Sequence, residues 1–194
     1  MPATDLPTPF PASTTRPVTR AERDELIALG VISSQGGVLD PPARPRRSVI
    51  ARTAMQAHSV LNEAYNYPKA ASFARGIRFD LGDKTMLMIS GTASVDEAGL
   101  STHLGDFRAQ LWRTYRNISA LLAAEEATWH DIVRTTCYLR DIERDYGDFN
   151  DIRTAFFGWL GLDPLPASTG IQARLCREDL LVEIEAIAVI PRER

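Results

Sequence analysis

Two carboxylates, Glu183 and Glu185, interrupt the apolar segment 180–190 near the end of the chain. Alternate side chains of a strand point to opposite faces, so both glutamates would share one face with Leu181 and Ile187. Burial beside aliphatic side chains disfavours a charged carboxylate and raises its pKa. An acid that keeps its proton near neutrality can serve as a general acid in catalysis. The alternative is an edge strand whose glutamates face water.

The other potentially reactive side chains indicate little further chemistry. Cys137 and Cys176 lie in apolar, strand-like segments, which suits reduced thiols better than a disulfide. We expect Cys137 to be an inert core thiol and Cys176 either to line a pocket or to be structural. The histidines lack the paired spacing of metal ligands, so we expect no metal and no other cofactor; they are His58, His103 and His130.

The composition limits the class of protein. A chain of 194 residues, 44% of them hydrophobic, suits one well-packed domain. The net charge is −3 and the basic residues are scattered, so we expect no nucleic-acid partner. The sequence shows no secretory leader and no apolar run near the roughly 18 residues that cross a bilayer. We therefore expect a soluble, cytoplasmic protein without membrane association.

Changes in composition divide the chain into three parts. Residues 1–48 are rich in Pro, Thr, Ser and Arg and predict an irregular N-terminal arm with one helix over 21–29. Residues 49–68 predict a helical lead-in, because their apolar residues recur at helical spacing. Residues 69–192 predict the compact domain.

The compact domain alternates strand and helix patterns. The predicted strands are 77–81, 86–90, 132–139, 169–175 and 180–190, and the predicted helices begin after Asp106 and span 145–160. This β-β-α-β-α-β-β order predicts an α+β fold in which both helices cover one face of a single sheet. The other face, which would carry Glu183, needs a cover. Self-association into a closed symmetric ring would supply it.

Several motifs in this order resemble those of the Rid (YjgF-type) superfamily over roughly residues 70–190. They are Ile-Ser-Gly-Thr-Ala-Ser94, Gln110 with Asn117, the run 131–141, Phe156-Phe157, Pro166-Ala167 and Val-Glu-Ile-Glu-Ala-Ile-Ala188. The resemblance implies a homotrimer with clefts between subunits. It also implies hydrolysis of reactive enamines or imines to carbonyl compounds and ammonia.

The resemblance assigns site residues and shows one departure. Glu183 falls on the family's active-site glutamate, and Asn150, Phe156 and Phe157 fall where a neighbouring subunit helps to wall the cleft. Deaminating members read Pro-Ala-Arg where this chain reads Pro-Ala-Ser168. That arginine binds a substrate carboxylate through two hydrogen bonds, whereas serine offers one neutral hydrogen bond. A compensating arginine would come from Arg75, Arg174 or Arg177.

A narrower resemblance links the chain to the C-terminal, Rid-like half of chorismatases, which remove pyruvate from chorismate. It is carried by Ser-Phe-Ala-Arg75, by Ser-Gly-Thr-Ala-Ser94 and by the run 175–185. In this resemblance Glu183 would protonate the enol pyruvyl methylene and Cys176 would lie in the pocket wall. Chorismatases also carry an additional N-terminal domain, which is larger than the arm of this chain.

These patterns together predict a Rid-superfamily enzyme for a small, unsaturated, carboxylated metabolite, with Glu183 as general acid in an intersubunit cleft. One alternative is a chorismatase-like hydrolase or lyase. Another is a ligand-binding or chaperone-like protein without turnover, which the missing arginine favours. The expected substrate-binding residues are Phe73, Arg75, Ser90, Thr92, Asn150, Phe156, Phe157, Ser168, Arg174 and Cys176.

Overall fold

The computed structural model describes residues 18–42, 50–67 and 70–192. The chain divides into two compact units, residues 1–48 and 49–194. The first unit contains helix α1 (Arg20–Ala28). Its start is fixed by a capping box, in which the Thr19 hydroxyl accepts from the Glu22 amide while the Glu22 carboxylate accepts from the Thr19 amide. The helix predicted over 21–29 is therefore confirmed, one residue earlier at each end.

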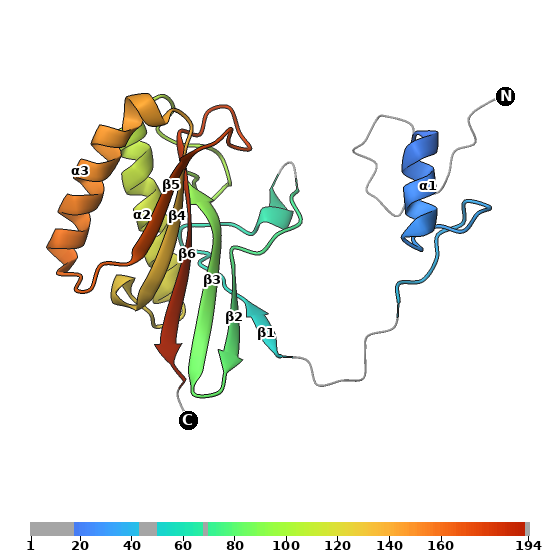
Figure 1. Ribbon diagram of the computed structural model, residues 1–194, viewed down its shortest axis with the longest axis horizontal. Coiled ribbons are helices and arrows are strands. Elements are labelled where there is room, and N and C mark those ends of the chain that lie inside the picture. The colour runs from blue at the N-terminus through green and yellow to red at the C-terminus, as the bar shows by residue number, and fades with distance from the viewer. Residues whose placement is uncertain (1–17, 43–49, 68–69, 193–194) are drawn as a thin grey trace. The chain divides into compact units, whose positions relative to one another are not determined.

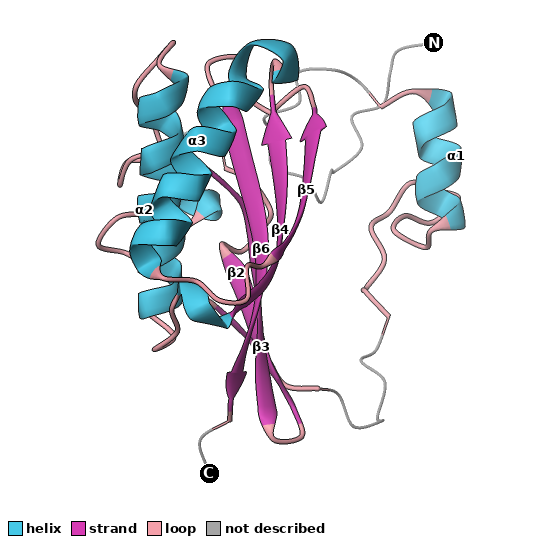
Figure 2. Cartoon of the chain, turned by 60° about the vertical axis from the view of Figure 1, so that its left-hand side comes forward, coloured by secondary structure: helices cyan, strands magenta, loops and turns pink. Residues whose placement is uncertain are grey.

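The second unit is built around a mixed six-stranded sheet (Figure 1). Its strands, in spatial order, are β1 (Arg52–Ala54), β2 (Gly76–Leu81), β3 (Lys84–Ala93), β6 (Val182–Pro191), β4 (Ile132–Leu139) and β5 (Ala167–Gln172). Only the β4–β5 pair is parallel. Helices α2 (Phe107–Ala123) and α3 (Ile142–Leu160) both pack on one face of this sheet (Figure 2). The predicted α+β fold and element order are confirmed, with β1 as an added strand.

Local signals fix the ends of the two long helices. The Asp106 carboxylate accepts from the Ala109 amide at 2.9 Å at the start of α2, and the Asp141 carboxylate accepts from the Arg144 amide at 3.1 Å at the start of α3. Helix α3 ends at Gly161, whose φ of 68° is a left-handed conformation that favours glycine. Because Asp141 is the cap, α3 begins three residues before the predicted start.

The helical lead-in predicted over 49–68 is wrong for residues 50–67. These residues contain strand β1 and a 3-10 turn, η1 (Ala64–Asn66), and no α-helix. Strand β1 pairs with the outer edge of β2, whose backbone groups would otherwise lack partners. Met55 and Ala57 are buried on either side of the exposed Gln56, which is the alternation of an extended chain. Pairing with the edge of β2 therefore determines the structure of this segment, although its apolar residues recur at helical spacing.

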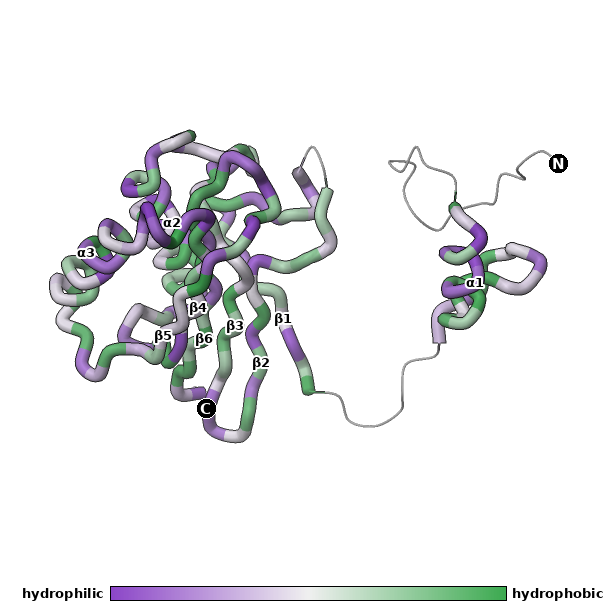
Figure 3. Tube along the Cα trace, turned by 45° about the horizontal axis from the view of Figure 1, so that its top comes forward, coloured by the Kyte–Doolittle hydropathy of each residue, from purple (hydrophilic) through white to green (hydrophobic). Residues whose placement is uncertain are grey.

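The sheet has one covered face and one open face. On β6, Val182 and Ile184 are buried beneath the helices, whereas Glu183 and Glu185 point to the opposite face, as the alternation predicts. Apolar residues run along β3 and β6, and the two long helices alternate between hydrophobic and hydrophilic residues (Figure 3). The open face also carries Met88, which is 46% exposed. The candidate functional site lies on this open face.

Candidate functional site

Glu183 lies at the centre of the sheet, with Ala93 of β3 on one side and Tyr138 of β4 on the other. The register of β3 shifts beside it, between residues 89 and 92. A Cβ added to Gly91 in this irregular stretch would lie only 2.0 Å from Glu183 Oε1. The carboxyl group therefore occupies space that only a glycine at position 91 leaves open.

The surroundings of Glu183 favour its protonated form. Burial is the main cause that raises the pKa of this carboxyl group, and the nearby charge of Glu185 raises it further. Arg177 and Arg75 act in the opposite direction but do not reverse the shift. The direction is the one that the sequence predicts, and it suits a group that donates a proton.

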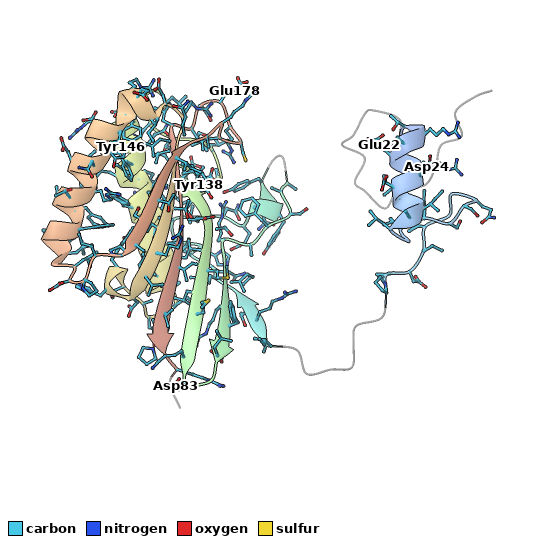
Figure 4. The ribbon with its side chains drawn as sticks, in the orientation of Figure 1. Glu22, Asp24, Asp83, Tyr138, Tyr146 and Glu178 are labelled. Carbon is cyan, nitrogen blue, oxygen red and sulfur yellow. The ribbon has the colours of Figure 1, made fainter. Side chains whose placement is uncertain are left out.

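Tyr138 completes the open face beside the two glutamates, and sequence reasoning missed it. Figure 4 labels Tyr138 on β4, one residue before the strand ends at Leu139. Burial and the charge of Glu185 raise the pKa of its phenol, so its hydroxyl stays neutral. The alternation of side chains along β4 could have predicted the face on which Tyr138 lies. Only the observed strand pairing places Tyr138 directly opposite Glu183.

Arg75 and Arg177 form a second part of the site around one aromatic ring. Arg75 is 4% exposed, and its Nε donates to the Asn62 carbonyl at 3.0 Å. Its guanidinium carbon lies 4.9 Å from the centre of the Tyr67 ring and 5.2 Å from that of Phe73. The guanidinium carbon of Arg177 lies 5.3 Å from the same Tyr67 ring. Tyr67 therefore holds two cations near Glu183 by cation–π contacts.

Among the described residues, three buried polar atoms around these arginines have no hydrogen-bond partner: Glu63 Oε1, Tyr67 Oη and Arg75 Nη2. Burial lowers the pKa of Arg75, whereas the negative charge of Glu63 raises it. Glu63 and Tyr67 escaped sequence reasoning because both fall in the segment that was predicted as a helical lead-in. Unsatisfied buried groups are uncommon and often mark places where a ligand or water completes the hydrogen bonding.

The loop that carries Arg177, between β5 and β6, is tied to the helix-covered side of the unit. Gln110 of α2 donates to the Asp179 carbonyl at 2.8 Å and accepts from the Leu181 amide at 2.8 Å. Arg140 donates to the carbonyl of Arg177. Side chains distant in sequence therefore hold the loop by its backbone.

Ser90 and Phe73 lie beside Arg75, whereas Thr92 pairs with Ile184 and so shares the helix-covered face. Ser90 donates to the Ala74 carbonyl at 2.8 Å, and Thr92 donates to the Ser90 carbonyl at 2.9 Å. Both hydroxyl protons are therefore used within the fold, which indicates that these residues shape the backbone of the site. Phe73 is 42% exposed, and its ring contacts the Arg75 guanidinium.

The structure places Ser168 on the face of the sheet opposite to Glu183. The register of β5 pairs Ser168 with the buried Thr135, which donates to the serine hydroxyl at 3.1 Å, and Arg153 of α3 donates to it at 3.4 Å. The neighbouring Thr169 is the residue that shares the face of Glu183. Within one subunit Ser168 therefore lies away from Glu183, because a motif match does not set the strand register. Its predicted role in a cleft between subunits stays a prediction.

The α3 residues also pack on the helix-covered side. Asn150 accepts from Arg153 at 2.7 Å, and the ring of Phe156 stacks on Tyr115 with 4.8 Å between centroids. Phe157 is 6% exposed within its own subunit. Phe157 is therefore a core residue of its own subunit, and its predicted place in the wall of a neighbour's cleft stays a prediction. The role predicted for Asn150 and Phe156 toward a second subunit stays a prediction.

The remaining candidates lie at the surface or in the core. Arg174 is exposed and lies 3.9 Å from Glu178, which Figure 4 labels in the β5–β6 loop. Cys176 is exposed in the same loop, whereas Cys137 is buried and its pKa is raised by that burial. The predicted core position of Cys137 is confirmed.

Within 18–42, 50–67 and 70–192, no group of three or more His, Cys, Asp and Glu side chains is placed to hold a metal ion. In those same ranges, no helix has the length and apolar character needed to cross a membrane.

A mixed sheet with two helices packed on one face is the α+β fold of the Rid (YjgF-type) class. The family model described as Endoribonuclease L-PSP matches residues 65–190, and the chain belongs to this family. It is 32% identical over 126 residues to the 2-iminobutanoate/2-iminopropanoate deaminase of Salmonella typhimurium, a match that covers 64% of this chain and 92% of the relative.

Two solved structures from E. coli share the fold. The YjgF gene product is 30% identical with a TM-score of 0.52, and the match covers 66% of this chain and 97% of that one. TdcF, solved with bound serine, is 26% identical with a TM-score of 0.53, and the match covers 67% of this chain and 98% of that one. In both cases the unmatched part belongs to this chain, whereas the relative is almost fully covered.

Proposed function

We propose that the protein is an enzyme that hydrolyses the enamine or imine form of a small carboxylated metabolite, with Glu183 as its general acid. The observation that carries this proposal is the position of the half-buried Glu183, whose carboxyl group lies over Gly91 between Ala93 and Tyr138, where burial raises its pKa. The Salmonella relative bears the name of an iminobutanoate and iminopropanoate deaminase, which supports the reaction class. The serine bound to TdcF supports a small, carboxylated ligand.

The chemistry needs one proton donor and one water molecule. Glu183 donates its proton to the β-carbon of an enamine or to the nitrogen of an imine; either gives a cationic iminium, which the resulting carboxylate stabilises. Water then adds to the iminium carbon and loses a proton to Glu183. The proton of the new hydroxyl group moves to the nitrogen, and the carbon–nitrogen bond breaks to release ammonia and the carbonyl product. General acid–base help of this kind accelerates a reaction by roughly 10² to 10⁴.

An assay with 2-iminobutanoate generated in situ tests the proposal directly. We expect the protein to form 2-oxobutanoate and ammonia clearly faster than the spontaneous hydrolysis measured without it. A rate equal to the spontaneous rate would contradict deamination. Release of pyruvate from chorismate by the same preparation would favour the enol-ether alternative, and ligand binding without any turnover would favour the non-catalytic one.

We also propose that the open face of the sheet is covered by other copies of the chain in a homotrimer. The face carries apolar side chains that water would otherwise contact, among them Met88 at 46% and Ile171 at 42% exposed. Light scattering at micromolar concentration is expected to give about three subunit masses, because a closed ring covers this face on every copy. A stable monomer at that concentration would remove the intersubunit cleft from the mechanism.

A further inference from the structure

We propose that Arg177, supported by Arg75 and Tyr67, forms the subsite that binds the substrate carboxylate in this protein. The proposal rests on the function proposed above and names the group that selects the substrate. It assigns carboxylate recognition to the β5–β6 loop and not to the Pro166-Ala167-Ser168 segment. Ser168 cannot fill that role within the subunit, since its hydroxyl lies on the helix-covered face.

Hydrogen bonds orient the guanidinium group of Arg177, but their acceptors do not neutralise its charge. Its Nη1 donates to the Gly99 carbonyl at 2.7 Å and to the Ser101 hydroxyl at 3.3 Å, and both acceptors are uncharged. Ser101 in turn donates to Asp179 at 2.9 Å. Within the described part of the chain, no carboxylate forms an ion pair with Arg177. Its remaining N–H groups are therefore available to an anion, which a planar guanidinium can bind through two hydrogen bonds.

Gly99 contacts both Arg177 and the Tyr67 ring against which the Arg177 guanidinium lies. Its φ of +78° is a left-handed conformation that favours glycine, and an added Cβ would lie 2.1 Å from an edge carbon of the Tyr67 ring. The same residue supplies the carbonyl that Arg177 binds. The ring and the guanidinium are thus fixed together before any ligand arrives.

The charges of the site leave room for one anion. Arg75 and Arg177 lie close enough that the charge of Arg177 lowers the pKa of Arg75, and Glu63 is the carboxylate that opposes this effect most strongly. Among the described residues, Arg75 Nη2 has no hydrogen-bond partner and Arg177 has no ion-pair partner. A ligand carboxylate could accept from both guanidinium groups. Like charges held together in a partly buried site favour the binding of such a ligand.

The subsite is also within electrostatic reach of the proton donor. Both arginines lower the pKa of Glu183, so their charges act on its carboxyl group. An anion bound to them would weaken that effect and help Glu183 keep its proton until the reaction. The same contact would therefore position the substrate and support its protonation.

Isothermal titration with a matched pair of ligands tests the assignment without any need for turnover. The probes are 2-oxobutanoate and its neutral amide, 2-oxobutanamide, which differ in the carboxylate. We expect Arg177→Gln to weaken binding of 2-oxobutanoate by about 100-fold, the range for removing one partner of a hydrogen-bonded charge pair, and to leave amide binding unchanged. Arg177→Lys keeps the charge without the planar fork and is expected to show an intermediate loss.

The control is Arg116→Gln, which removes the same charge from an exposed position on α2. It is expected to change the binding of neither probe. The assignment is overturned if wild type does not prefer the acid to the amide, or if Arg177→Gln weakens both probes equally or neither. If Arg177→Gln does not fold, the same criteria apply to Arg177→Lys. A clear acid preference without deamination would overturn the proposed reaction and leave this subsite intact.

Discussion

Replacing Glu183 with glutamine is expected to slow turnover by about 100-fold or more while ligand binding survives. Glutamine keeps the size of the side chain and its ability to hydrogen-bond, but it has no proton to transfer at neutral pH. The measurement is kcat for in situ 2-iminobutanoate, together with titration of 2-oxobutanoate. Unchanged turnover in this variant would exclude Glu183 as the proton donor.

Glu185→Gln is the matched control, because Glu185 lies on the same strand and the same face, two residues further on. Its loss should leave most of the activity and lower the pKa of Glu183, since the charge of Glu185 helps to raise it. The wild-type rate should fall as pH rises through the raised pKa of Glu183, because the donor then loses its proton. In Glu183→Gln this fall should be absent, and in Glu185→Gln it should move to lower pH.

The same pKa shift has a consequence for stability with a defined sign. The folded protein holds the Glu183 proton more tightly than the unfolded chain does, so the folded state loses stability as pH rises from the unfolded to the folded pKa. Glu183→Gln removes this contribution. The quantity to compare is the melting temperature of the variant minus that of wild type. This difference should be larger at a pH above the folded pKa of Glu183 than at a pH below the unfolded pKa.

Gly91→Ala is expected to reduce kcat by about 100-fold with little loss of stability, since a misplacement of about 1 Å at a reacting group can cost that much. The added Cβ would lie 2.0 Å from Glu183 Oε1 and 2.9 Å from Cδ, so the carboxyl group must move away. Only the end of a flexible side chain is displaced, and the sheet around it can remain. Kinetics on 2-iminobutanoate and a thermal melt measure the two effects separately.

Gly158→Ala is the comparison for this experiment. Gly158 lies within α3, and an added Cβ there would meet no atom within 4 Å. Alanine favours a helix over glycine, so this variant should be as active as wild type and slightly more stable. Full activity in Gly91→Ala would show that the position of Glu183 over Gly91 is not the one used in the reaction.

The sequence predicted the parts of the fold that depend on local pattern. The alternation on β6 placed Glu183 on the face away from the helices, and the apolar repeat of α2 placed its buried side toward the sheet. Burial of Glu183 beside apolar neighbours followed from the same pattern, and so did the direction of its pKa shift. These features rest on spacing within a single element.

Contacts between distant segments could not be predicted in this way. In the site, the Tyr67 ring lies against Gly99, and the Gly99 carbonyl accepts from Arg177. Gly99 and Arg177 are 78 residues apart in the sequence. The face on which Ser168 lies depends on its register against β4, which a one-residue shift would reverse. The segment 50–67 forms β1 because β2 offers it a free edge, and its own spacing does not report that partner.

The anchoring of the β5–β6 loop bears on how ligand choice can change in this family. Gln110 and Arg140 hold the loop through backbone atoms, so the exposed side chains of Arg174, Cys176 and Glu178 take no part in fixing its path. Little conformational entropy should be lost in the loop when a ligand binds, because folding has already ordered it. Substitutions at these three positions can alter the chemistry presented to a ligand while the loop keeps its shape. The loop can therefore exchange its exposed side chains in evolution while its backbone stays in place.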